Sequence, residues 1–154
     1  MIQVESVHHL EEMEAALCLS AQRHGAHILT VQPLTPLLKE DARRAAHDAI
    51  SFTICHSELY GALLAADLRF SVFLPCRIAA IRQRTGVTLE TLSPKHFCHH
   101  LNRPDLDRLV APLETLLHEL LEEMASAIPQ NARQKAHKDA ALGAREGQVS
   151  MRGS

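Results

Sequence analysis

Two thiols and an imidazole in the middle of the chain are the side chains best suited to chemistry. Cys55 and His56 follow one apolar segment, and Cys76 opens another segment 21 residues after Cys55. A thiolate is a nucleophile and a metal ligand, and an imidazole beside it can serve as its base. Cys76 is therefore a candidate reactive thiol, with Cys55 as the resolving thiol and His56 as the base. The competing interpretation is that both cysteines are small, buried apolar side chains.

Short motifs surround both thiols. The chain reads Leu74-Pro75-Cys76 before one apolar segment and Cys55-His56-Ser57 after the other. This pair of motifs resembles the bacterial family catalogued as domain of unknown function 302, in which a Cys-Asn-Pro after one strand is followed by a Leu-Pro-Cys before the next. The resemblance extends over about residues 5 to 125. It implies a fold rather than an activity, and the missing proline after Cys55 removes a rigid turn.

A second group of chemical side chains follows Ser93-Pro94, a pair typical of a helix start. His96, His99 and His100 would share one face of this helix, and imidazoles at positions i and i+4 can bind one metal ion. Cys98 would point to a different face, so a metal ion would need a further ligand such as Cys55 or His56. The alternative interpretation is a solvated polar face.

The cofactors that this chemistry suggests are a metal ion or haem. A pocket that carries Cys55, His56 and Cys76 could bind either one, or another small ligand, because axial ligation of haem iron needs only one or two side chains. Covalent haem attachment is excluded because the chain has no Cys-x-x-Cys-His motif. Phosphate-binding loops, nucleophile elbows and His-Glu-x-x-His motifs are also absent from the sequence.

The elements that must position these residues follow from hydrophobic periodicity. In the first half, Ser6 is expected to cap the first helix, and strand alternation places Cys55 on the face opposite Phe52. The predicted elements are strand 2–6, helix 7–24, strand 27–31, helix 37–49 and strand 50–55. In the second half we expect helix 58–66, strand 76–84, a hairpin turn at Thr85-Gly86, strand 87–92, and helices from 94 to about 101 and from 105 to about 127.

This order of elements predicts an α+β fold, a small mixed β-sheet with helices packed on one face and a long C-terminal helix. Residues 1–128 would form a single domain. The polar residues 129–154 lack periodicity and are expected to form a mobile tail, whose end, Met151–Ser154, is similar to vector-derived sequence. The long helix carries a broad leucine-rich stripe, which could pack on its own sheet or form a homodimer seam.

Composition excludes several classes of partner. The 154 residues carry a net charge of -2, so there is no basic excess for nucleic acid or an anionic membrane surface. No secretory signal or stretch of transmembrane length is visible, and the cysteines form no Cys-x-x-Cys pair. We therefore expect a cytoplasmic protein with reduced thiols.

Three functions remain open at this level. The first is a small soluble protein that binds a metal ion, haem or another small ligand through Cys and His side chains at strand ends. The second is a thiol-dependent redox or sulfur-transfer protein with Cys76 as its reactive group. The third is a homodimeric interaction module that uses the leucine-rich helix.

Overall fold

A computed structural model describes residues 1–45 and 48–127 of the chain. The tail predicted over residues 129–154 therefore lies outside the described residues. Within them, five strands form one sheet in the spatial order β1-β5-β4-β3-β2. The strands are β1 (Ile2–Ser6), β2 (His27–Pro33), β3 (Ala49–Cys55), β4 (Cys76–Gln83) and β5 (Gly86–Thr91). All four neighbouring pairs are antiparallel, so the sheet that we expected to be mixed contains no parallel pair among these strands.

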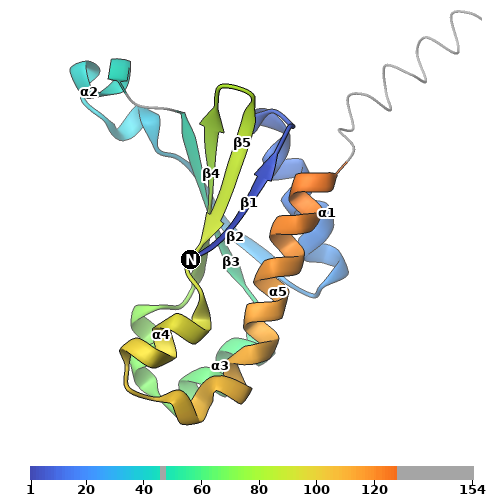
Figure 1. The fold of residues 1–154 in the computed structure, drawn as a ribbon, viewed down its shortest axis with the longest axis vertical. Helices are drawn as coiled ribbons and strands as arrows, with labels where there is room; N and C mark the ends of the chain where they lie inside the picture. Colours follow the sequence, from blue (N-terminus) through green and yellow to red (C-terminus); the bar gives the residue numbers. More distant parts are fainter. Residues whose placement is uncertain (46–47, 128–154) are drawn as a thin grey trace, which may run out of the picture.

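The helices confirm the α+β class and the long C-terminal helix. Figure 1 shows α1 and α5 side by side along one face of the sheet, with α3 and α4 gathered beyond the end at which β4 begins. The helices are α1 (Met13–Arg23), α2 (Glu40–Ala45), α3 (Ser57–Ala66), α4 (Pro94–His100) and α5 (Asp107–Ser126). No helix in the described part of the chain is both long and apolar enough to cross a membrane.

The leucine-rich stripe of α5 packs into the hydrophobic core of its own chain. Of its large apolar side chains only Leu109 is exposed, at 36%, whereas Leu113, Leu117 and Leu120 are fully buried. They pack in one cluster with strand residues such as Phe52. Since burial of apolar surface is the main stabilising term, the stripe has its partner within the chain. It no longer gives a reason to expect a homodimer, which stays a prediction.

Polar contacts fasten α1 to α5 around one carboxylate. Glu123 accepts hydrogen bonds from Ser20 and Arg23, and the His24 ring contacts Glu119 as well as Glu123. Burial opposes ionisation of Glu123, but the hydrogen bonds from Ser20, Arg23 and His24 outweigh it and lower its pKa to about 2. The two helices that cover the sheet are therefore joined by an ionised, hydrogen-bonded carboxylate.

Several predicted boundaries in the first half were wrong. The helix expected over 7–24 begins only at Met13, after a 3-10 turn at Leu10–Glu12. Ser6 does not cap it, because its hydroxyl donates instead to the Ala125 carbonyl, 3.1 Å away. Within the described residues, the helix expected over 37–49 is limited to α2, while β2 extends to Pro33, which an edge strand tolerates.

The hairpin between β4 and β5 is shifted by one residue from the predicted position. Arg84 and Thr85 form its two-residue loop, and Gly86, which was expected in the turn, opens β5 opposite Gln83. Gly86 has φ of +153°, and a Cβ atom there would lie 2.0 Å from the Ser6 carbonyl oxygen. Only glycine fits at this close approach of two strands.

Candidate functional site

A pocket of about 320 Å³ surrounds the Leu74-Pro75-Cys76 segment at the start of β4. Its lining is mostly apolar and comes from the segment before β4, the end of β5 and helix α4. The lining residues are Val72, Phe73, Leu74, Pro75, Cys76, Arg77, Thr91, Leu92 and Phe97. The rings of Phe73 and Phe97 stack with centroids 4.9 Å apart, so two elements distant in sequence meet in one wall.

Local structure explains why the chain forms this wall. A 3-10 helix covers Leu68–Val72, and the N–H groups of Phe73 and Leu74 both donate to the Phe70 carbonyl, at 2.9 and 2.8 Å. Phe70 itself is fully buried and packs on Phe97 with ring centroids 5.7 Å apart. Hydrogen bonds within the segment thus hold its backbone, and the buried ring of Phe70 anchors it in the core.

A carboxylate outside the pocket joins its two walls. Asp67 accepts from Arg69 at 2.7 Å and from Arg103 at 2.9 Å. Arg69 belongs to the 3-10 helix, whereas Arg103 lies between α4 and α5. Hydrogen bonds from Arg69 hold the pKa of Asp67 well below its usual range, so the carboxylate is ionised at neutral pH. This charge cluster fixes the Phe73 and Phe97 walls relative to each other.

Cys76 is a neutral, buried side chain rather than an activated thiol. It is 2% exposed, and burial raises the pKa of its thiol to about 11. Its backbone N–H donates to the Tyr60 hydroxyl at 3.0 Å, and that hydroxyl donates to the Ile54 carbonyl at 2.7 Å. Only the thiolate is a good nucleophile, so the environment of Cys76 disfavours the chemistry that the sequence suggested for it.

Cys55 and Cys76 lie on neighbouring strands, but their side chains are on opposite faces of the sheet. The strand register pairs Cys76 with Ile54, and Cys55 is paired with His27 on β2. Because successive side chains of a strand point to opposite faces, Cys55 and Cys76 face opposite sides of the sheet. All four cysteines are free. The arrangement does not support a role for Cys55 as a resolving thiol.

His56 lines a groove that is separate from the pocket at Cys76. It precedes α3, and its Nδ1 accepts from the Leu59 N–H at 3.4 Å. It lines an open groove between α3 and α5 together with residues such as Arg108 and Glu119, and it does not line the pocket at Cys76. His56 is therefore placed as a helix cap and not as a base for Cys76.

The three histidines of α4 lie on its surface. Ser93 caps the helix as predicted, with its hydroxyl accepting from the His96 N–H at 3.3 Å. His96, His99 and His100 are all exposed, and His99 pairs with Asp107 at 3.2 Å. Across residues 1–45 and 48–127, no three His, Cys, Asp or Glu side chains are grouped so that they could hold a metal ion. The predicted histidine metal site gains no support.

Sequence reasoning missed the aromatic side chains that shape the pocket. Phe97 lies between the candidate ligand His96 and Cys98, and Tyr60 lies within an apolar helix. A usable signal was present, because the chain has only four phenylalanines and three of them, Phe70, Phe73 and Phe97, meet at this place. Such concentration of a scarce, large side chain indicates a shaped apolar site.

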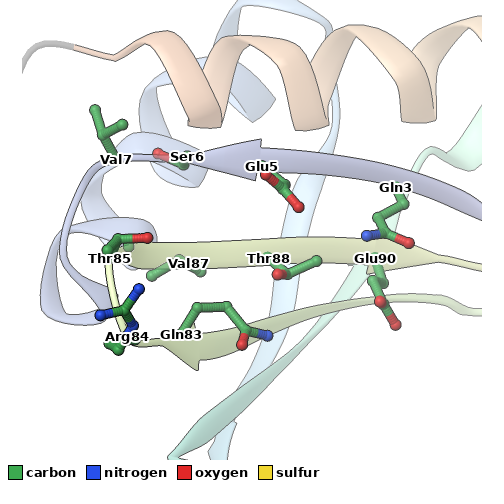
Figure 2. A pocket seen from close by; sticks show the side chains of 11 residues that line it. Gln3, Glu5, Ser6, Val7, Gln83, Arg84, Thr85, Val87, Thr88 and Glu90 are labelled. Atoms are coloured by element: carbon green, nitrogen blue, oxygen red, sulfur yellow. The ribbon is translucent and has the colours of Figure 1, made fainter.

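A second hollow, of about 500 Å³, lies on the sheet face opposite α5. Figure 2 shows the polar side chains of Gln3, Glu5, Thr88 and Glu90 along β1 and β5, with Arg84 at the hairpin. The hollow is open and polar, and Gln3, Glu5 and Glu90 alternate with buried residues of the same strands, whereas Thr88 is itself buried. It has the character of a solvated sheet face and is the weaker candidate.

Comparison with known proteins agrees with this fold. The family described as "Domain of unknown function DUF302" matches residues 2–124. A solved structure, "Crystal structure of uncharacterized conserved protein DUF302 from Bacillus stearothermophilus", is similar with a TM-score of 0.74 and 20% sequence identity, over 80% of this chain and 96% of that chain. This likeness shows a shared fold. None of the curated proteins matches the chain.

Proposed function

Since the chain belongs to the domain of unknown function 302 family, whose description assigns no activity, we propose its function from its own geometry. It binds a small, mainly apolar organic ligand in the pocket around Leu74-Pro75-Cys76. The observation that carries this proposal is the pocket itself, partly enclosed, apolar and about 320 Å³ in volume. Small-molecule sites are concave, mostly apolar and roughly 300–1,000 Å³ in size.

The lining favours binding over catalysis. It includes no histidine, aspartate or glutamate, so it offers no acid–base pair. Its thiol, Cys76, stays protonated at neutral pH because burial raises its pKa to about 11. A protonated thiol is a weak hydrogen-bond donor with apolar bulk, which suits a wall more than a nucleophile.

The same lining argues for an organic ligand rather than a metal ion or haem. Both of these need an imidazole, a thiolate or another strong ligand atom. Within the pocket lining, Cys76 is the only such side chain, and it holds its proton. Cys76 therefore supports ligand binding through shape and not through coordination.

Preorganisation and exposed rim residues both support binding. The Asp67 cluster and the Phe70 anchor fix the walls without a ligand. At the mouth, Val72 and Leu92 are 83% and 60% exposed. A ligand that covered them would remove apolar surface from water, worth about 2.5 kcal/mol for each roughly 100 Å².

The test uses the neutral fluorophore N-phenyl-1-naphthylamine, whose emission rises in apolar surroundings. The chain has no tryptophan and one tyrosine, so protein fluorescence interferes little. Leu92→Glu places a charge at the mouth, and Leu29→Glu is its matched control, because Leu29 is 54% exposed and does not line the pocket. We expect saturable binding that Leu92→Glu weakens about tenfold, through lost apolar contact and carboxylate desolvation. Absence of saturable binding, or equal affinities in all three proteins, would refute the proposal.

A further inference from the structure

One charged residue lines the pocket, and it is the cation Arg77. Arg77 is exposed beside Cys76, and the lining contains no carboxylate to neutralise it. Its backbone is held in place, because the Thr91 hydroxyl donates to the Arg77 carbonyl at 2.7 Å and Thr91 is itself part of the lining. The pocket therefore combines an apolar interior with a fixed attachment point for a guanidinium group.

Among the described residues Arg77 has no ion pair, a property that it shares with Arg84 and Arg108, but of these three it alone lines this pocket. Arg23, Arg69, Arg82 and Arg103 each form an ion pair with an aspartate or glutamate. Within residues 1–45 and 48–127, no carboxylate lies at ion-pair distance from Arg77. An unpaired guanidinium can bind an oxyanion through two parallel hydrogen bonds.

From this juxtaposition we infer that the ligand is a small amphipathic anion, with an apolar body in the pocket and an oxyanion on Arg77. The inference rests on the proposed binding function and adds the charge of the ligand to it. The oxyanion can be a carboxylate, sulfonate or phosphate, since the guanidinium recognises their shared geometry. Because Arg77 is solvated, its contribution is modest, and apolar contact supplies most of the affinity.

Two probes with the same ring system distinguish the proposed binding site from the inferred charge of its ligand. N-phenyl-1-naphthylamine is neutral, whereas 8-anilinonaphthalene-1-sulfonate carries a sulfonate on the same skeleton. We expect Arg77→Gln to weaken binding of the sulfonate probe about fivefold and to change binding of the neutral probe by less than about twofold. Arg77→Lys keeps the charge and should retain most of the sulfonate affinity. Raised salt should shrink the difference between wild type and Arg77→Gln.

Arg84→Gln is the matched control, because it removes the same charge from the opposite end of β4. It should leave binding of both probes unchanged, which excludes an effect of net charge alone. If both probes bind to the wild type and Arg77→Gln affects them equally, or affects neither, the inference about ligand charge is wrong while the binding site stands. If neither probe binds to the wild type, the proposed function itself fails.

Discussion

The hydroxyl of Tyr60 links the pocket to the sheet, and its removal tests this description of the site. The hydroxyl accepts from the Cys76 N–H at 3.0 Å and donates to the Ile54 carbonyl at 2.7 Å. Tyr60 is 7% exposed, and burial raises the pKa of its phenol well above the usual range. Tyr60→Phe removes only the oxygen, so the ring keeps its place in the core while two backbone groups lose a partner.

The magnitude follows from those two groups. A buried N–H left without a partner costs about 1–3 kcal/mol, and a carbonyl, which has a second lone pair, costs about 1 kcal/mol. We therefore expect Tyr60→Phe to lower the free energy of unfolding by about 2–4 kcal/mol. For a domain of this size each kcal/mol corresponds to roughly 3–5 °C, so the midpoint should fall by roughly 6–20 °C.

Urea unfolding followed by far-ultraviolet circular dichroism measures this loss directly, because the signal does not depend on the substituted ring. Binding of N-phenyl-1-naphthylamine to the folded variant should weaken as well, since Cys76 opens the strand that forms the pocket wall. A loss of less than about 1 kcal/mol would mean that water or another group replaces the hydroxyl. The buried link between Tyr60 and the pocket would then be refuted.

Three further expectations concern reactivity, pH and backbone geometry. Exposed Cys18 should react with iodoacetamide well before Cys76 at pH 7, by mass spectrometry of the labelled peptides; early labelling of Cys76 would contradict its raised pKa. Glu123→Gln should cost about 1–2 kcal/mol at pH 7, after allowance for solvent screening, and much less near pH 3. A pKa lowered from 4.5 to about 2 gives stability that is present above pH 4.5 and lost as pH falls toward 2, so an equal loss at both pH values in urea titrations would exclude this origin. Gly86→Ala should cost about 2–4 kcal/mol in urea unfolding, because the new Cβ would meet the Ser6 carbonyl; a neutral effect would show that β1 can move.

The fold was largely accessible from the sequence wherever periodicity is local. Alternation in β3 and the stripe of α5 predicted both elements within a few residues, and Ser93 capped its helix as expected. The errors arose where a tertiary contact overrides a local preference. The position of Ser6 in the sequence is typical of a helix cap. In the folded chain its hydroxyl instead donates to the carbonyl of Ala125, 119 positions later in the sequence. Strand directions also depend on long-range pairing, which no window of the sequence contains.

The candidate site was predictable in location but not in the arrangement of its side chains. The Leu74-Pro75-Cys76 motif does mark a pocket wall. The reactive triplet of Cys55, His56 and Cys76 is dispersed, however, because a strand sends consecutive side chains to opposite faces and the following helix uses the imidazole as a cap. Sequence spacing places residues near one another, whereas the direction of each side chain decides which of them share a site.

Burial then decides what the remaining thiol can do. A reactive cysteine needs a nearby positive charge or helix N-terminus to stabilise its thiolate, and access for the second reactant. Cys76 has a raised pKa and 2% exposure, while the adjacent arginine follows it on the strand and therefore points to the other face. Arg77 is exposed and lines the same pocket, so under our proposal its guanidinium meets the anionic group of the ligand from the solvent side. The local sequence Cys76-Arg77 thus disfavours thiol catalysis at this position and agrees with our proposal of an amphipathic ligand.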